Sequence, residues 1–417
     1  MEFDDLSPSG IHRIAGYSPY LDQLAGFASD MGLRQRSSLV HLERALNEFW
    51  ALGQNSILSW SPLDDGMIVL VVPHYAVAEY ISGTPGTSDS ALDVTARFIT
   101  ELISGDRQLS LAQMQKVARL FQTEPRQVRL REPLTGHPVE TQIIEKMIRR
   151  YGINYVESRA VTLFDIVGFS LLTPFQQMTQ LNSLSYSLNS AHAKMLEQDV
   201  GINFARSTTG DGFYVWNRDN GLEANVNLYH FMHIVLADNA IARRKSTSHI
   251  VPRLRACFHV GPCYEFHQAE GLNPTIHDFI VGDVTIELAR IVDAAMPGQI
   301  LVGDFLAEVK GSTDLAQSQV HLDAAAFMER AQGNLPKLSG LVLSGERVSA
   351  IKCYLTGERL ESGDFNVRKL TIRDKHGLTR HAFNAKVNIY RDTAEPILLG
   401  IEDRKLPLDA FGGSTLV

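Results

Sequence analysis

Apolar and polar residues in the middle of the chain alternate between a strand-like pattern and a helix-like spacing. From residue 158 to about residue 305, this pattern predicts the order strand, helix, strand, strand, helix, strand, followed by a further strand, helix and strand. The predicted elements are, in chain order, residues 161–164, 174–195, 202–208, 213–216, 225–242, 254–260, 279–281, 283–295 and 299–302. This order is typical of an α+β sandwich with helices on one face of a mostly antiparallel sheet.

The preceding part of the chain has a different pattern. Residues 1–135 mix helical stretches with one clear strand at 67–72. A capping box at Ser110 opens a helix that runs to about Gln122. Proline and glycine within 133–138 then break the pattern and predict a domain boundary. We therefore expect an N-terminal α/β regulatory region over residues 1–135.

A linker helix is predicted over 136–157, between this region and the strand at 161–164. Its apolar residues recur at helical spacing and form one stripe, whereas the neighbouring basic residues lie on other faces. The members of the stripe are Ile143, Ile144, Met147, Ile148 and Tyr151. Such a stripe either pairs with its copy in a dimer or is buried on its own domain.

The last part of the chain becomes rich in strands. Residues 311–345 form a helical stretch with a Gly- and Pro-containing end, which we interpret as an insertion in a central domain over 158–356. Beyond it, apolar and polar residues alternate over 383–389, and the stretch from Asp374 to Gly377 predicts a turn before this strand. We expect a β-rich C-terminal extension over 357–417.

Composition and charge narrow the function classes. The 417 residues are 44% hydrophobic and 21% charged, which is ordinary for a globular protein of two or three domains. A net charge of −8 and a pI near 6.0 argue against a general binder of nucleic acids or anionic membranes. We expect no nucleic-acid partner.

The cysteines and the apolar runs indicate a compartment. Cys257, Cys263 and Cys353 have no metal-ligand spacing and suit a reducing environment, so we expect neither a disulfide nor a zinc site. The longest apolar runs, at 67–72 and 234–237, fall far short of a membrane span, and the acidic N-terminus lacks a signal-peptide charge pattern. We therefore expect a cytoplasmic protein with no membrane span.

Two aspartates carry the candidate chemistry. Asp165 follows the buried strand at 161–164, and ligands of open α/β sheets collect at the carboxyl ends of strands. Asp211 forms the tip of a hairpin between the strands at 202–208 and 213–216. If these strands are neighbours, the two carboxylates face each other and can hold a pair of hard cations such as Mg²⁺ or Mn²⁺.

Nearby residues provide groups for the phosphates of a substrate. Gly168-Phe169-Ser170 leads from Asp165 towards the next helix, and a glycine there lets backbone amides approach a phosphate closely. Phosphoryl chemistry also needs a positive side chain for the charge that develops in the transition state. Arg290 is our candidate for that side chain.

Three blocks of this sequence resemble the catalytic domain of class III nucleotide cyclases in their order and spacing. The blocks are Phe164-Asp165-Ile166-Val167-Gly168-Phe169-Ser170, Thr209-Gly210-Asp211-Gly212-Phe213-Tyr214, and Gly282-Asp283 through Ala289-Arg290 to Pro297-Gly298-Gln299-Ile300. The resemblance covers residues 158 to about 305 and extends at most to 355. It implies a ferredoxin-like βαββαβ core and catalytic sites shared between two cyclase domains, as in a homodimer.

The resemblance also implies an activity and a role for each matched residue. The expected reaction is attack of the 3′-hydroxyl of a nucleoside triphosphate on its own α-phosphate, which yields a 3′,5′-cyclic nucleotide and pyrophosphate. Asp165 and Asp211, with the backbone of Ile166, match the groups that hold two Mg²⁺ or Mn²⁺ ions per active site. Arg290 matches the arginine that stabilises the transition state. The phosphate-binding turn is matched by Val167, Gly168, Phe169 and Ser170.

Other positions depart from the family pattern. Ser207 stands where adenylate cyclases carry a base-reading lysine and guanylate cyclases a glutamate, and Ile286 stands where many members carry a ribose-orienting asparagine. The second base-reading position falls at Phe279 or, with a one-residue slip, at Asp278. The phosphate-binding lysine expected near the end of the domain has no firm counterpart, and Arg347 is our candidate. Base specificity is therefore open.

Three alternatives stay open. A non-catalytic module could keep the cyclase fold and bind a nucleotide in order to sense it, which the departures above favour and the two aspartates disfavour. A diguanylate-cyclase-like enzyme is suggested by the hairpin at 209–213, but Gly212 replaces the second acidic residue of that family's hairpin. A DNA-binding role for the helix at 110–122 would require the arginines within 126–131 to line a groove.

Overall fold

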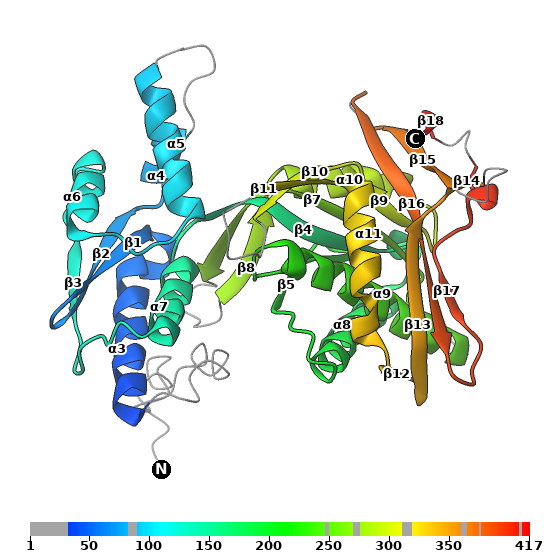
Figure 1. The fold of residues 1–417 in the computed structure, drawn as a ribbon, viewed down its shortest axis with the longest axis horizontal. Helices are drawn as coiled ribbons and strands as arrows, with labels where there is room; N and C mark the ends of the chain where they lie inside the picture. The colour runs from blue at the N-terminus through cyan, green and yellow to red at the C-terminus, as the bar shows by residue number, and fades with distance from the viewer. Residues whose placement is uncertain are drawn as a thin grey trace. The chain divides into compact units, whose positions relative to one another are not determined.

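The chain forms two compact units in the computed structural model (Figure 1). The structure describes residues 32–81, 90–246, 250–269, 276–310, 319–359, 365–374, 377–407 and 411–417. Unit 1 comprises Met1–Val156 and Tyr264–Phe279, and unit 2 comprises Glu157–Cys263 and Ile280–Val417. Strands β4 (Asn154–Ile166), β7 (Leu254–Ala269) and β8 (Ile276–Val281) each contribute residues to both units.

Unit 1 is built on a three-stranded antiparallel sheet in the order β1-β2-β3. Its strands are β1 (Asn55–Leu63), β2 (Gly66–Pro73) and β3 (Arg126–Arg129). Its described helices are α3 (Leu33–Trp50), the 3₁₀ turn η2 (Ala51–Gly53), α4 (Ala76–Ile81), α5 (Ser90–Ser104), α6 (Leu111–Leu120) and α7 (Pro138–Arg150). The strand predicted at 67–72 lies within β2, and the predicted capping box at Ser110 begins α6.

Alternation along β2 places its side chains in two cores on opposite faces of the sheet. Met67 and Val69 pack with side chains of α3 and α7, whereas Leu70 and Val72 pack with side chains of α5 and α6. The apolar stripe of α7 is buried in the first of these cores, and each of its five members is at most 2% exposed. Of the two alternatives for this helix, the structure shows burial on its own domain.

Unit 2 contains a larger sheet whose main path has the order β12-β13-β16-β9-β7-β4-β6-β5. The strands not yet named on this path are β5 (Phe204–Thr208), β6 (Gly212–Asn217), β9 (Ile300–Gly303), β12 (Val342–Leu343), β13 (Glu346–Leu355) and β16 (Thr379–Arg391). β6 pairs antiparallel with both β4 and β5, whereas β7 runs parallel to β9. The sheet is therefore mixed, with antiparallel pairs predominating among its described strands.

A layer of helices covers one face of this sheet. The described helices of unit 2 are α8 (Pro174–Leu196), α9 (Leu222–Lys245), α10 (Asp283–Ala294) and α11 (Ala324–Asn334), with 3₁₀ turns η3 (Phe169–Leu171), η4 (Leu335–Leu338) and η5 (Asp403–Lys405). Thr173 begins α8 with the predicted capping box. Side chains such as Leu188 of α8, Phe231 of α9 and Phe327 of α11 share one core with the strands beneath them. None of the helices described in either unit is both long and apolar enough to cross a membrane.

Helix α10 lies on the opposite face of the sheet. Along β7, Ala256 and Phe258 point into the core shared with α8 and α9, so Cys257 points the other way. Gly261 has the same orientation as Cys257, and a β-carbon on Gly261 would lie 3.4 Å from Val284 of α10. The prediction of helices on one face of the sheet is therefore wrong for α10. Helical periodicity shows that a helix has an apolar side, but it does not show which face of a sheet that side meets.

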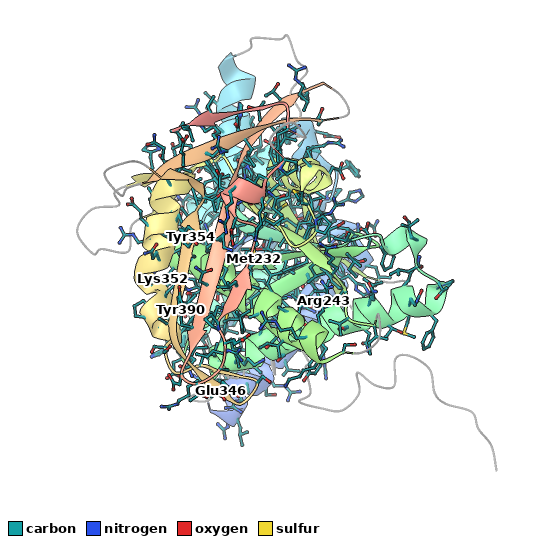
Figure 2. All side chains as sticks on the ribbon, turned by 90° about the vertical axis from the view of Figure 1, so that its right-hand side faces the viewer. Met232, Arg243, Glu346, Lys352, Tyr354 and Tyr390 are labelled. Atoms are coloured by element: carbon teal, nitrogen blue, oxygen red, sulfur yellow. The ribbon has the colours of Figure 1, made fainter. Side chains whose placement is uncertain are left out.

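The C-terminal strands continue the sheet of unit 2. β16 pairs with β9 and with β13, and β15 (Phe365–Arg373) forms the predicted hairpin with β16. Figure 2 shows this part of the sheet from outside, where Lys352 of β13 lies beside Tyr390 of β16. The segment predicted as an extension thus shares a sheet with the predicted central domain.

The remaining elements frame the predicted insertion and the end of the chain. They are β10 (Leu306–Lys310), β11 (Gln319–Asp323), β14 (Gly357–Arg359), β17 (Ile397–Leu399) and β18 (Gly413–Leu416). The predicted helical insertion at 311–345 contains α11 and η4, but also β11 and β12, and residues 311–318 lie outside the described residues. Residues 375–376 of the predicted turn after Asp374 lie outside them as well.

Buried histidines make the stability of unit 2 depend on pH. His230 and His259 are at most 8% exposed, and burial lowers the pKa of each from 6.5 to about 4. The unfolded chain therefore binds protons at these histidines at higher pH than the folded protein does. The contribution of each neutral histidine to the free energy of unfolding is fully present above pH 6.5 and is lost as the pH falls towards about 4. The expected loss is about 3 kcal/mol for each histidine.

Urea unfolding at about pH 7 and about pH 5 measures this dependence. A His259→Asn protein is expected to lose less stability between the two conditions than the wild type, because one titrating group is gone. His381→Asn is the matched control, since His381 is exposed on β16. Equal stability of the wild type at both pH values would contradict the prediction.

Candidate functional site

Strands β4 and β6 bring the two candidate carboxylates together. Asp165 lies near the end of β4, is 6% exposed, and is paired in register with Gly212 at the start of β6. The residue before Gly212 is Asp211, whose carbonyl oxygen accepts a hydrogen bond from the Ile166 amide over 3.0 Å. The strands are thus neighbours, and Asp165 and Asp211 lie next to each other across them.

This close pairing requires glycine at position 212. A β-carbon there would lie 1.9 Å from the carbonyl oxygen of Phe164, which is held in the β4 backbone. Gly212→Ala is therefore expected to destabilise the protein by about 2 kcal/mol and to force apart the strands that carry both aspartates. Chemical denaturation measures the loss.

Gly201→Ala is the matched control for this substitution, because within the described part of the chain no residue other than its two sequence neighbours comes within 4 Å of its β-carbon position. It is expected to change the free energy of unfolding by less than about 0.5 kcal/mol. If Gly212→Ala were as stable as Gly201→Ala, the close approach of β6 to β4 would be refuted.

An arginine on β7 completes the group around Asp165. Arg255 Nε donates to Asp165 Oδ2 over 2.6 Å, and Arg255 Nη1 donates to the carbonyl oxygen of Ala295, which follows α10, over 3.2 Å. The start of β7 is held beside the end of β4 by a hydrogen bond from the Val167 amide to the Arg253 carbonyl, of 2.9 Å. Arg255 is not among the site residues predicted from the sequence.

Burial and neighbouring charges act in opposite directions on Asp165. Burial is the largest cause of the rise of its pKa above 3.8, and the charges of Asp211 and Asp293 add to that rise. The hydrogen bond and the positive charge of Arg255 lower the pKa. Arg255 therefore counteracts the tendency of this buried carboxyl group to take up a proton.

The predicted phosphate-binding turn follows Asp165. Gly168 has φ +70°, a left-handed conformation that glycine favours, and leads into η3. The amide of Val167 donates to Arg253 within the sheet, so it is not free to bind a phosphate. The amides of Gly168, Phe169 and Ser170 have no acceptor among the residues that the structure describes. These three amides are the ones open to an anion.

Arg290 lies on α10, over the face of the sheet to which Asp165 points. Tyr214 of β6 is paired with Leu163, two residues before Asp165, so the Tyr214 side chain points to that face. Its hydroxyl donates to the Thr285 carbonyl oxygen at the start of α10 over 3.1 Å. Burial raises the pKa of Tyr214, and the nearby positive charge of Arg290 lowers it. The structure thus places Arg290 beside the strand that follows Asp211.

The positions expected to read the base and ribose differ in their surroundings. Ser207 lies on β5, and beside it Arg206 donates to Ser185 Oγ over 2.7 Å. The Arg206 guanidinium lies 5.2 Å from the centroid of the Phe213 ring. Ile286, at the position predicted to match the ribose-orienting asparagine, is 49% exposed on α10 and presents an apolar surface.

The other predicted base-reading residues belong to unit 1. Asp278 pairs with His267, Oδ1 to Nε2, over 2.7 Å, and the Phe279 ring stacks on Phe266 with centroids 5.7 Å apart. Both pairs join β8 to β7 within that unit. Arg347 is exposed near the start of β13 in unit 2. The structure therefore groups the aspartates and Arg290 in unit 2, without Asp278 or Phe279.

The donor atoms near Asp165 suit a hard cation in kind, since carboxylate and carbonyl oxygens are ligands that Mg²⁺ and Mn²⁺ accept. Arg255 uses Oδ2 of Asp165, which leaves Oδ1 for a metal. Across the described ranges, no group of three or more His, Cys, Asp or Glu side chains is arranged to hold a metal ion. A cation bound between Asp165 and Asp211 would therefore need the phosphates of a substrate to complete its ligands.

Comparisons with known proteins give a weak similarity to nucleotide cyclases. No protein-family model matches the sequence, and no curated protein matches it. The guanylate cyclase domain of RhGC from Catenaria anguillulae in complex with GTP is 12% identical, with a TM-score of 0.33, over 58% of this chain and 100% of that chain. The adenylyl cyclase CyaB from P. aeruginosa is 14% identical, with a TM-score of 0.28, over 40% of this chain and 93% of that chain. The non-canonical dimeric guanylyl cyclase domain of the RhoGC fusion protein from the aquatic fungus Blastocladiella emersonii is 16% identical, with a TM-score of 0.29, over 37% of this chain and 90% of that chain.

Proposed function

We propose that this protein is a cytoplasmic, homodimeric nucleotide cyclase that converts a nucleoside triphosphate to a 3′,5′-cyclic nucleotide and pyrophosphate, with two Mg²⁺ or Mn²⁺ ions per site. The observation that carries the proposal is the pairing of Asp165 with Gly212, which sets Asp165 and Asp211 side by side. Adjacent carboxylates, open backbone amides and an arginine on the same face are the groups that this reaction needs.

The strand order supports a ferredoxin-like βαββαβ core. The elements follow the chain as β4, α8, β5, β6, α9 and β7, and their strands lie side by side as β7-β4-β6-β5. The first and third strands of this series are central neighbours. That adjacency brings the end of β4, with Asp165, to the hairpin of β5 and β6, with Asp211.

Each charged or polar group of the site has its own role in the proposed reaction. Asp165 and Asp211, with the backbone of Ile166, are the ligands for the two cations, which when bound acidify the 3′-hydroxyl and neutralise the polyphosphate. The amides of 168–170 bind phosphate oxygens. Arg290 stabilises the negative charge that develops in the transition state, and Arg255 holds Asp165 in its charged form.

The division of the chain into two units suggests which part forms the catalytic dimer and which part regulates it. Unit 2 of one chain carries one copy of each proposed catalytic group, so a symmetric dimer holds two equal sites. Unit 1 has its own sheet and its own two cores, and the proposed metal ligands and Arg290 lie outside it. Unit 1 is therefore the proposed regulatory region.

A second candidate function is a non-catalytic module that binds a nucleotide and regulates a partner. The 2.6 Å ion pair between Arg255 and Asp165 favours it, because the guanidinium supplies positive charge where a metal ion would otherwise supply it. The apolar Ile286 favours it too. The adjacency of Asp211 to Asp165 disfavours it, since a nucleotide sensor has no need of two neighbouring carboxylates.

Metal-dependent release of pyrophosphate separates the two candidates. Purified protein is incubated with ATP, GTP, CTP or UTP, in the presence of Mg²⁺, Mn²⁺ or a chelator. A cyclase releases pyrophosphate from at least one nucleotide, and only when the metal is present. A non-catalytic module binds a nucleotide in calorimetry without releasing pyrophosphate. Neither binding nor release with all four nucleotides would overturn both candidates.

A further inference from the structure

A largely buried network of ion pairs joins α10 to the β15–β16 hairpin. Glu287 and Arg290 lie about one turn apart on α10, whereas Asp374 follows β15 and Arg380 lies on β16. Arg380 Nη1 pairs with Glu287 Oε1, and Arg380 Nε lies 3.5 Å from Asp374 Oδ2. Arg290 Nε lies 3.8 Å from the same oxygen. Positive and negative charges thus alternate across the contact between helix and hairpin.

Asp374 is the most buried of the four side chains in this network. Its side chain is 2% exposed, and its Oδ1 accepts a hydrogen bond from the Leu378 amide over 2.9 Å. Its carbonyl oxygen accepts another from the Gly377 amide, also over 2.9 Å. Two backbone amides of its own turn therefore hold Asp374, and the short aspartate side chain has fewer rotatable bonds than the arginine with which it pairs. Arg290 is therefore the member of the pair whose position is restricted.

The remaining donors of Arg290 make no hydrogen bond to the residues that the structure describes. Its Nε faces Asp374, while Nη1 and Nη2 have no hydrogen-bond partner among the residues that the structure describes. The Arg290 side chain is 23% exposed, so these two nitrogens are accessible to a ligand. A guanidinium held at Nε presents its other two nitrogens as a planar fork, which matches the oxygens of a phosphate.

We propose that Asp374 is a positioning residue for Arg290, and that it directs Nη1 and Nη2 towards the phosphates of the nucleotide. This inference rests on the proposed function. A long side chain has many rotamers, and holding it before the substrate binds removes part of the entropic cost of reaching the transition state. Arg380 also pairs with the Asp374 carboxylate, so the negative charge of Asp374 is shared between two arginines and does not fully neutralise Arg290. The C-terminal hairpin then belongs to the catalytic apparatus of unit 2.

A double-mutant cycle in the cyclase assay tests this role. Asp374→Asn keeps the volume of the side chain and removes its charge, and it is expected to lower kcat on the order of 10-fold to 100-fold with little change in KM. In an Arg290→Ala background, the same substitution is expected to lower kcat by less than about twofold, because the group that Asp374 positions is gone. Asp374→Glu is expected to restore part of the loss. Equal reductions in both backgrounds would overturn the proposal.

Asp403→Asn is the matched control, because Asp403 lies in η5 and pairs with β15 of the hairpin without contacting α10 through that pair. Asp403 pairs with Arg368 Nε of β15 over 3.1 Å, and the two side chains are 18% and 15% exposed. This pair joins the hairpin to η5 rather than to α10, so its removal is expected to leave kcat within about twofold of the wild type. If Asp403→Asn lowered kcat as much as Asp374→Asn, the effect would be a general loosening of the hairpin, and the proposal would fail.

Thermal unfolding makes the test independent of activity. If the wild type forms no cyclic nucleotide, the proposed function fails. Tm values of the wild type, Asp374→Asn, Arg290→Ala and the double variant still show whether Asp374 interacts with Arg290. The double variant is expected to lower Tm by less than the sum of the two single variants, because both remove the same interaction. Additive decreases in Tm would show that the two side chains are not coupled, which would overturn the inference whatever the activity.

Discussion

Asp211→Ala and Asp165→Ala are each expected to lower the rate of cyclic-nucleotide formation by about a thousandfold or more, because each removes a proposed ligand of the catalytic cations. Asp211→Ala is the cleaner substitution of the two. Asp165→Ala also leaves Arg255 without the carboxylate that it contacts at 2.6 Å. Initial rates measured over a range of Mg²⁺ or Mn²⁺ concentrations give the effect, and excess metal is not expected to restore either variant.

Asp219→Ala is the matched control for these two substitutions. Asp219 is an exposed aspartate of unit 2 that follows β6, and its loss is expected to leave the rate unchanged. Unfolding curves for all three variants show whether each is folded under the conditions of the assay. A rate close to that of the wild type in Asp211→Ala or Asp165→Ala would remove that residue from the proposed metal site.

Arg290→Ala is expected to lower kcat by about 100-fold to 1,000-fold while changing KM by less than about threefold. The proposed role of Arg290 is to stabilise charge that develops only in the transition state, so its loss should affect the chemical step more than the binding of substrate. Arg290→Lys is expected to recover part of the rate, because lysine keeps the charge but lacks the planar fork. Both constants are measured with whichever nucleotide the enzyme uses.

Arg243→Ala provides the comparison for Arg290→Ala, since Arg243 lies near the end of α9, in the helix layer on the other side of the sheet (Figure 2). Its kcat and KM are expected to match those of the wild type. A loss confined to KM in Arg290→Ala would mean that Arg290 binds the ground state and the transition state equally, contrary to the role proposed here.

The surroundings of the two aspartates could be predicted because the signals lie within a few residues of each. An apolar run before Asp165 and a turn sequence around Asp211 give a strand end and a hairpin tip by local rules. The structure agrees, with β4 ending at Ile166 and β6 beginning at Gly212. Whether these strands are neighbours depends on the topology of the sheet, which local sequence patterns do not determine.

The charged partners of Asp165 and Arg290 could not be predicted, because they come from distant parts of the chain. Arg255 lies 90 residues after Asp165, and Asp374 lies on a hairpin that the local pattern places in a separate extension. One local signal for Arg255 was present. Arg255 lies between Leu254 and Ala256 in an apolar strand, and a charged side chain in such a strand needs a counter-charge.

The length of β7 shows where local rules mislead. The strand predicted from the sequence ends at 260, and the following Gly261-Pro262 is typical of the end of a strand. The structure continues β7 through these residues to Ala269, and its last part belongs to unit 1. Pairing with neighbouring strands therefore overrides the local preference for a break. The same continuation accounts for the assignment of Asp278 and Phe279 to unit 1, because β8 pairs with β7.

The mass of the product formed from each nucleoside triphosphate tests the central claim most directly. Wild-type protein, with Asp211→Ala as the matched control, is incubated with each of the four triphosphates and Mg²⁺ or Mn²⁺, and the products are identified by mass spectrometry. The expected result is a cyclic mononucleotide from at least one substrate, absent with the Asp211→Ala protein. Unchanged triphosphate in every wild-type reaction, or a cyclic dinucleotide in place of the mononucleotide, would contradict the assignment.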